Sequence, residues 1–353
     1  MKKHIDYIDV MRVVASLFVV FMHASATGLR TNVASHSDWF ILTGISSIAF
    51  CAVPLFFMIT GYVLTSSERT SDVKVLFKER LPRLIVPLIF WSILYIIYEM
   101  ISLNEFSLVT FLKKIVLIVE KPVNISLWFM YLLVAMYLIS PLLCSGLKSL
   151  NKQGEKLILG IIIIVELISI LGIVAPSFSS RYLNIEILNY FNIFDGNLAS
   201  FILGWYLGKT KKHFSSIAVW LTMLVTYGII VAGTINLSSI LGKYISTFQS
   251  QNSGLEILIA SCIFILIKQS KILDTQKIKS IAHKISDYTF PIYLMHSLIL
   301  LLSANIIVVT SAGGVIIETI LVYFVALLIA FICSHIPFLS YLTCGIKKTK
   351  KRI

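Results

Sequence analysis

The stretch IDVMRVVASLFVVFMH (residues 8–23) carries two ionisable side chains, Arg12 and His23, with ten uncharged residues between them. In a helix they lie roughly 16 Å apart along the axis, at about 1.5 Å per residue. Eleven steps of about 100° come within about 20° of three full turns, so the two side chains share one face. Asp9, one turn before Arg12, can pair with it. A membrane helix with such a face turns it toward protein or a water-filled cavity.

The composition is that of an integral membrane protein. Hydrophobic residues make up 58% of the 353 positions and charged residues 13%, whereas soluble domains contain about 45–50% apolar and about 25% charged residues. The net charge of +13 does not indicate nucleic-acid binding, because the basic residues lie at the ends of apolar segments and are not gathered into a patch interleaved with aromatic residues. We expect an all-α protein with one polytopic membrane domain over residues 1–345 and a basic cytoplasmic tail over 346–353.

Ten apolar segments are candidates for transmembrane helices. A bilayer core needs roughly 20 mostly apolar residues per helix. Two candidates, the sixth and the eighth, are shorter than this. The ten segments lie near residues 7–27, 42–65, 84–103, 127–144, 156–175, 194–208, 215–236, 253–268, 286–308 and 313–341.

The distribution of lysine and arginine sets the expected orientation. With the N-terminus inside, 23 of the 30 basic residues fall in cytoplasmic segments, 6 fall outside, and Arg12 lies within the first span. Cytoplasmic loops carry such an excess of basic residues. Ten helices with both termini cytoplasmic are therefore expected, with Arg12 near the inner end of the first helix and His23 toward its outer end.

The cysteines do not indicate a metal site or a disulfide framework. There are five of them, an odd number, and no two have CxxC spacing. We interpret them as small apolar packing residues, and we expect no bound metal.

Several motifs resemble the membrane acyltransferase-3 family. Besides residues 8–23, these are VPLFFMITGYVL (53–64), RLPRLIVP (80–87), LWFMYLLVAMYLISPLL (127–143) and SDYTFPIYLMH (286–296). The resemblance implies a multi-pass enzyme of the bacterial inner membrane. It implies transfer of an acyl group, usually acetyl from acetyl-CoA, to a hydroxyl of a cell-surface or lipid-linked carbohydrate.

Within that resemblance, His23 is the candidate general base that accepts the proton of the acceptor hydroxyl. Arg80 and Arg83 suit the phosphates of acetyl-CoA, because guanidinium groups bind phosphate oxygens in pairs. Arg12 is the second candidate catalytic residue. Because of its distance from His23, it is also assigned to binding the donor. Each of these residues also has a non-catalytic interpretation. Arg12 would reach the lipid headgroups and His23 would lie at the membrane interface. Arg80 and Arg83 would belong to a cytoplasmic loop that only sets the orientation.

Asp195 and Trp128 are weaker candidates for binding the acceptor. Asp195 precedes the sixth segment, where a helix-capping role is the default, and tryptophan is common at membrane interfaces. His296 could be structural. Two other functions stay open, namely a polysaccharide exporter or flippase without acyl-transfer chemistry and a sensor or accessory subunit.

Overall fold

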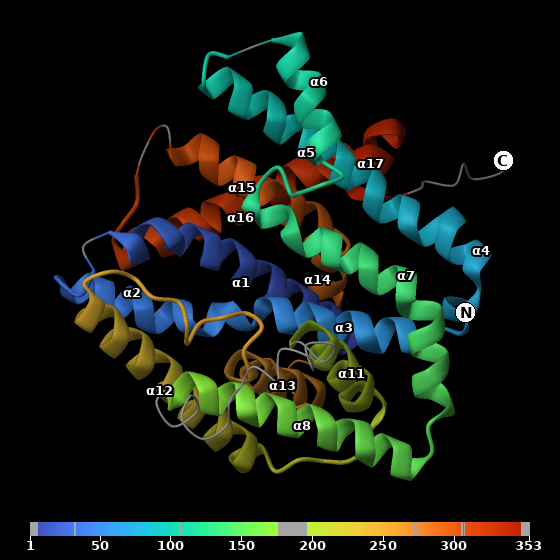
Figure 1. Cartoon of the computed structure of the whole chain (residues 1–353). Coiled ribbons are helices and arrows are strands. Elements are labelled where there is room, and N and C mark those ends of the chain that lie inside the picture. The colour runs from blue at the N-terminus through green and yellow to red at the C-terminus, as the bar shows by residue number, and fades with distance from the viewer. Residues whose placement is uncertain are drawn as a thin grey trace. The chain divides into compact units, whose positions relative to one another are not determined.

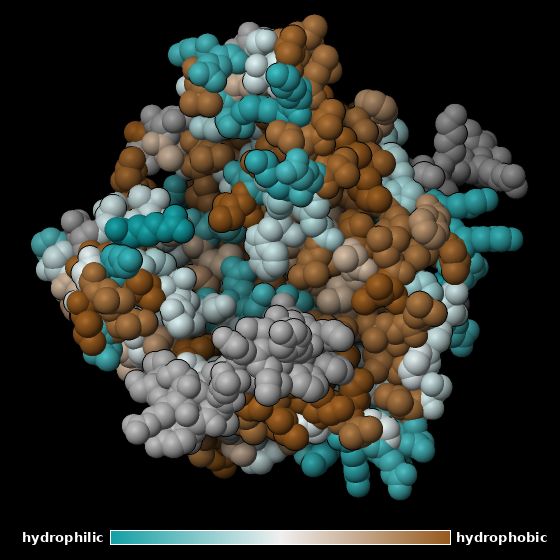
Figure 2. All heavy atoms as spheres, in the orientation of Figure 1, coloured by the Kyte–Doolittle hydropathy of each residue, from teal (hydrophilic) through white to brown (hydrophobic). Residues whose placement is uncertain are grey.

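The structure is a computed structural model that describes residues 6–31, 33–105, 107–175, 196–271, 273, 275–304, 306 and 308–346. Within these residues every regular element is a helix (Figure 1). Apolar side chains cover much of the visible face (Figure 2). Exposed large apolar residues are frequent on α12 (Ser216–Leu241) and α16 (Ala312–His335). The expected all-α membrane fold is confirmed.

The chain divides into two compact units, which are described separately. The first holds α1 (Asp6–Arg30), α2 (Ser37–Ser47), η1 (Ile48–Cys51), α3 (Ala52–Thr65), α8 (Lys152–Val174), α11 (Gly196–Lys209), α12, α13 (Gly254–Gln269), α14 (Gln276–Ser286) and the start of α16. The second holds η2 (Glu68–Ser71), α4 (Val73–Val75), η3 (Leu76–Arg80), α5 (Leu81–Ser102), α6 (Leu108–Leu117), η4 (Ile125–Leu127), most of α7 (Trp128–Ser149), α15 (Thr289–Ala304), the rest of α16 and α17 (Pro337–Cys344). A single domain over residues 1–345 stays a prediction.

The helices follow the ten expected segments, although not all of them are long enough to cross a bilayer. Among the described residues, 7 helices have the length and apolar character of a span, and α14 with α15 makes up to 8 if the pair counts as one bent span. The short sixth and eighth segments form α11 and α13, with 14 and 16 residues. Ten spans with cytoplasmic termini therefore stay a prediction.

In the first unit, α3 and α11 pack with their backbones in contact. A Cβ on Gly61 would lie 1.9 Å from the carbonyl oxygen of Phe201, and one on Gly204 would lie 2.0 Å from that of Met58. Gly208 follows Gly204 at four residues, and a Cβ there would meet the ring of Tyr62 at 2.0 Å. Small residues at this spacing allow membrane helices to approach closely. The glycines thus bring the C-terminal ends of α3 and α11 side by side.

In the second unit, α5 is the central helix. The Trp91 indole donates to the carbonyl of Thr343 in α17 at 3.2 Å, and the Tyr95 hydroxyl donates to the carbonyl of Leu294 in α15 at 3.1 Å. The helix α6, which was not expected from the sequence, packs on the buried cluster of Ile96, Met100 and Ile118. Side-chain hydrogen bonds and apolar packing therefore hold α6, α15 and α17 to α5.

Candidate functional site

The first turns of α1 hold Arg12 through a buried carboxylate. Arg12 Nη1 lies 3.5 Å from Asp9 Oδ1, which confirms the pair expected from their spacing. Asp9 is 3% exposed, and its Oδ2 lies 3.1 Å from Nδ1 of His283 in α14. Lys279, one turn earlier in α14, pairs with Asp6 at 3.1 Å. The inner part of the Arg12–His23 face is thus fixed by contacts with α14.

His23 lies on the same continuous helix, eleven residues after Arg12. Its imidazole is half-buried and interacts electrostatically with Arg30, the last residue of α1. Beside it, the Gln251 amide donates to the sulfur of Met22 at 2.9 Å. This contact brings the loop between α12 and α13 to the turn of α1 that carries His23.

That loop supplies further polar groups to the interior of the first unit. The Tyr244 hydroxyl donates to Gln249 Oε1 at 2.5 Å, and Gln249 Nε2 donates to the Ser47 hydroxyl at 2.8 Å. Burial raises the pKa of the Tyr244 hydroxyl, so it stays protonated and can donate. Gln249 is 1% exposed. The groups form a chain of hydrogen bonds that joins the loop to α2.

Glu256 is a buried carboxylate that the sequence analysis did not single out. The motif SGLE (253–256) matches a capping box, in which the glutamate would bond back to the backbone of the serine. Ser253 does cap α13 through the Glu256 amide at 3.3 Å. Glu256 itself is fully buried, and neither carboxylate oxygen has a hydrogen-bond partner among the described residues. It interacts electrostatically with Cys51 and Tyr244. The sequence feature that could have identified Glu256 is its position, because a glutamate inside an apolar segment is rare and is a candidate functional residue.

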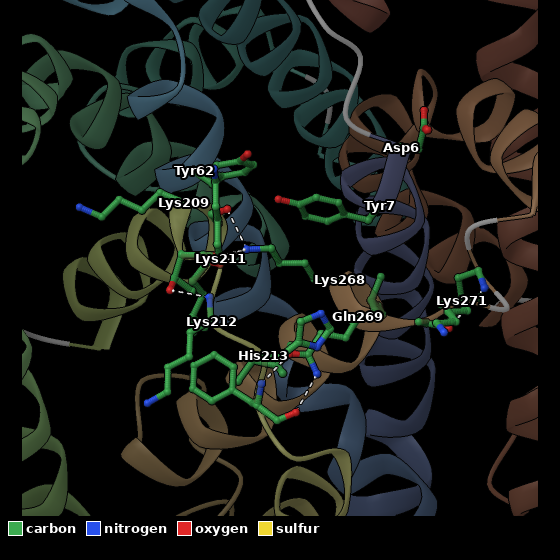
Figure 3. A pocket seen from close by; sticks show the side chains of 18 residues that line it. Asp6, Tyr7, Tyr62, Lys209, Lys211, Lys212, His213, Lys268, Gln269 and Lys271 are labelled. Carbon is green, nitrogen blue, oxygen red and sulfur yellow. Dashed lines mark hydrogen bonds between the residues drawn. The ribbon is translucent and has the colours of Figure 1, made fainter.

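At the opposite end of α1, helix ends of the first unit line an open cavity of about 620 Å³ (Figure 3). It is lined by the start of α1 and by Tyr62 of α3. The end of α11 and the segment after it contribute residues 207–214, and the end of α13 and the following turn contribute Ile265, residues 267–271 and Leu273. The expected orientation of the corresponding segments places all four of these helix ends on the cytoplasmic side. The cavity and His23 therefore lie toward opposite ends of α1.

A model of the acyltransferase domain of the acyltransferase-3 family matches residues 5–336. The chain belongs to the acyltransferase-3 family. It is accordingly a membrane acyltransferase, as the motifs indicated. No curated protein and no solved structure matches the chain.

Three candidate residues of this acyltransferase, Arg80, Arg83 and Trp128, belong to the second unit. Arg80 Nη1 donates to Thr70 Oγ1 at 2.8 Å, and its Nη2 donates to Ser67 Oγ at 3.0 Å. The two bonds give Arg80 a structural role in the segment before α5, and phosphate binding by Arg80 stays a prediction. Arg83, one turn later, is exposed. Trp128 is half-buried at the start of α7, in edge contact with Phe129.

Two candidate residues remain, Asp195 and His296. Asp195 lies outside the residues that the structure describes. His296 is fully buried in α15, where its Nδ1 donates to the carbonyl of Tyr293 at 2.6 Å. This bond within one helix fits the structural interpretation of His296. Among the described residues, no group of three or more metal-binding side chains is found.

Proposed function

We propose that the protein is an O-acetyltransferase of the bacterial inner membrane, which moves acetyl from cytoplasmic acetyl-CoA to a hydroxyl of a cell-surface or lipid-linked carbohydrate. The observation that supports this most is the single helix α1, which carries Arg12 and His23 about 16 Å apart on one face. Its inner end is held by α14, and its outer part meets the polar loop before α13. One face of one helix thus connects a donor side with an acceptor side.

In the proposed reaction, neutral His23 accepts the proton of the acceptor hydroxyl while that oxygen attacks the thioester carbonyl. The new C–O bond forms, the C–S bond breaks, and CoA leaves as a thiolate. The proton taken up by His23 is then available to the thiolate, so the step balances without another reactant. Arg12, paired with Asp9, lies too far along α1 to contact the same carbonyl. Its role is to hold the donor.

The groups around the outer half of α1 favour a hydroxyl-rich acceptor. Gln251 places a half-buried amide in the loop that meets the His23 turn. Gln249 and Tyr244 support this loop from inside, because their polar atoms already bond each other and Ser47. Amides and hydroxyls both donate and accept hydrogen bonds, as sugar hydroxyls require. Trp128 and Asp195 remain proposed acceptor contacts. The quoted motifs also resemble those of an O-acetyltransferase of enterobacterial common antigen, which supports a glycan acceptor.

Inverted membrane vesicles that contain the protein test this function directly. They are incubated with acetyl-CoA labelled in the acetyl group, and the lipid-linked glycans are extracted and analysed by mass spectrometry. We expect label in a glycan ester that mild alkali releases, and none with His23→Gln. Glycan that crosses the membrane without gaining label would instead support the exporter alternative.

A further inference from the structure

The cavity at the inner end of α1 has walls rich in lysine. Its described lining contains Lys209, Lys211, Lys212, Lys268 and Lys271, and the one carboxylate there is Asp6. The charge of Asp6 is offset by its ion pair with Lys279, 3.1 Å away. A recess lined by charges of one sign concentrates ligands of the opposite sign. The cavity is therefore suited to a ligand with several negative charges.

Two of the five lysines are engaged in holding the wall together. Lys268 Nζ donates to the carbonyls of Leu207, Gly208 and Thr210, at 2.5, 2.8 and 2.8 Å, and so caps the C-terminal end of α11. Lys209 pairs with Glu155 at 2.6 Å, and its ammonium lies 3.6 Å from the centre of the Trp205 ring. These contacts fix α11 against α8 and α13.

The segment after α11 is held in one conformation by the residue that follows Lys268. Gln269 Oε1 accepts from the Phe214 amide at 2.9 Å, and Gln269 Nε2 donates to the Phe214 carbonyl at 3.1 Å. Lys211 and Lys212 lie between these anchors, along one wall of the cavity (Figure 3). A cytoplasmic loop that served only as an orientation signal would need no such anchoring. The backbone that carries the two lysines is thus fixed before any ligand arrives, which lowers the cost of binding.

Lys211, Lys212 and Lys271 are exposed, and no ion pair of theirs occurs among the described residues. Next to them, the rings of Tyr7 and Tyr62 stack with centroids 6.1 Å apart and give the cavity an aromatic wall. The volume of about 620 Å³ falls in the range of small-molecule sites, roughly 300–1,000 Å³. Exposed ammonium groups beside an aromatic surface match a phosphorylated nucleoside.

We infer that Lys211, Lys212 and Lys271 bind the phosphate groups at the nucleotide end of the acyl-CoA donor. The inference rests on the proposed function for the identity of that donor. Tyr7, in the cavity wall, lies near the start of α1. Measured along the helix axis from Tyr7, Arg12 is about 8 Å away and His23 is about 24 Å away. The nucleotide end of the donor is thus bound at the inner end of α1, before Arg12, and its thioester end extends toward His23. An anionic lipid headgroup carries the same phosphate chemistry and is the competing source.

The test measures CoA binding to the full-length protein in phosphatidylcholine nanodiscs by thermophoresis, with adenosine 3′,5′-bisphosphate as competitor. CoA carries no acyl group, so no turnover interferes. Removing the three lysines should weaken CoA binding by about tenfold, since three exposed phosphate contacts each contribute about 0.2–1 kcal/mol. In a control variant, three other exposed lysines are removed, so the loss of charge is the same. This variant should bind CoA like the wild type. The test variant is Lys211→Ala, Lys212→Ala, Lys271→Ala, and the control is Lys152→Ala, Lys156→Ala, Lys284→Ala.

Each outcome decides one claim. Equal CoA affinity of the two triple variants would overturn the inference and leave the acetyl transfer of the proposed function standing. Lipid binding is measured by native mass spectrometry in nanodiscs that also contain phosphatidylglycerol. If the test variant loses phosphatidylglycerol but keeps its CoA affinity, the cavity binds lipid headgroups and the inference is overturned as well. A wild-type protein that binds no CoA and transfers no labelled acetyl would contradict the donor of the proposed function itself.

Discussion

The carboxylate of Asp9 lies 3.1 Å from the imidazole of His283, although 274 residues separate the two in sequence. Its other oxygen lies 3.5 Å from Arg12. One buried carboxylate therefore sets the position of Arg12 and also ties α14 to α1. In the proposed mechanism, Asp9 therefore acts through Arg12 as a positioning residue.

Asp9→Asn should weaken donor binding more than it slows the chemical step. The amide keeps the shape of the side chain but removes the charge that balances Arg12. We expect the apparent KM for acetyl-CoA to rise about tenfold with a smaller change in kcat, the pattern of lost ground-state binding. His283→Gln, which keeps a hydrogen-bonding group beside Asp9, should have a weaker effect. An unchanged KM in Asp9→Asn would remove Asp9 from donor positioning.

Arg80 and Arg83 should respond differently to substitution. Arg80 holds Ser67 and Thr70, so Arg80→Ala should make the segment before α5 more sensitive to limited proteolysis. Arg83 is exposed, and if it binds donor phosphate, Arg83→Ala should raise the acetyl-CoA KM about tenfold with an intact proteolysis pattern. Steady-state kinetics with purified variants checks both. A normal KM in Arg83→Ala would leave this residue as an orientation signal.

The glycine contact between α3 and α11 should be essential for stability. A Cβ on Gly204 would lie 2.0 Å from backbone of α3, so Gly204→Ala must push the two helices apart. We expect a fall of several degrees in the Tm of the detergent-solubilised protein, as for overpacking that costs about 1–3 kcal/mol. Gly228→Ala in α12 is the matched control, because nothing lies within 4 Å of its Cβ. A Gly204→Ala protein as stable as this control would show that the helices pack differently.

The parts of the site that depend on one helix could be predicted from the sequence. The spacing of Asp9, Arg12 and His23 along α1 follows from helical geometry alone, and the Asp9–Arg12 pair is found as expected. The burial of the Glu256 carboxylate could not be predicted in this way. Its motif is that of a helix cap, and only the packing of α13 in the first unit leaves its carboxylate buried without a hydrogen bond.

Features that join distant segments could not be predicted. The Asp9–His283 contact and the lysine-lined cavity both require helix ends that are far apart in sequence to meet. The boundaries of short helices were also hard to predict. Lys113 and Lys114 interrupt the apolar run that forms α6, so the sequence predicts an outer loop where this ten-residue helix lies.

The expected orientation can be tested by labelling single cysteines in a cysteine-free background. A cysteine in place of Lys211 should not react with a membrane-impermeant maleimide in intact cells, because its loop is expected inside. A cysteine in place of Lys243, in a loop expected outside, should react readily. Ready labelling at position 211 in intact cells would contradict both the topology and the cytoplasmic location of the cavity.

The role of His23 is tested most directly by comparing acetyl transfer and CoA binding in the purified His23→Gln protein. Glutamine keeps a hydrogen-bonding amide at this position but cannot accept the proton. CoA affinity and Tm should stay at the wild-type level while kcat falls by roughly 10²–10⁴, the range for a lost general base. His36→Gln, at an exposed histidine of the same unit, should transfer acetyl normally. A His23→Gln protein that turns over at the wild-type rate would contradict the proposed mechanism.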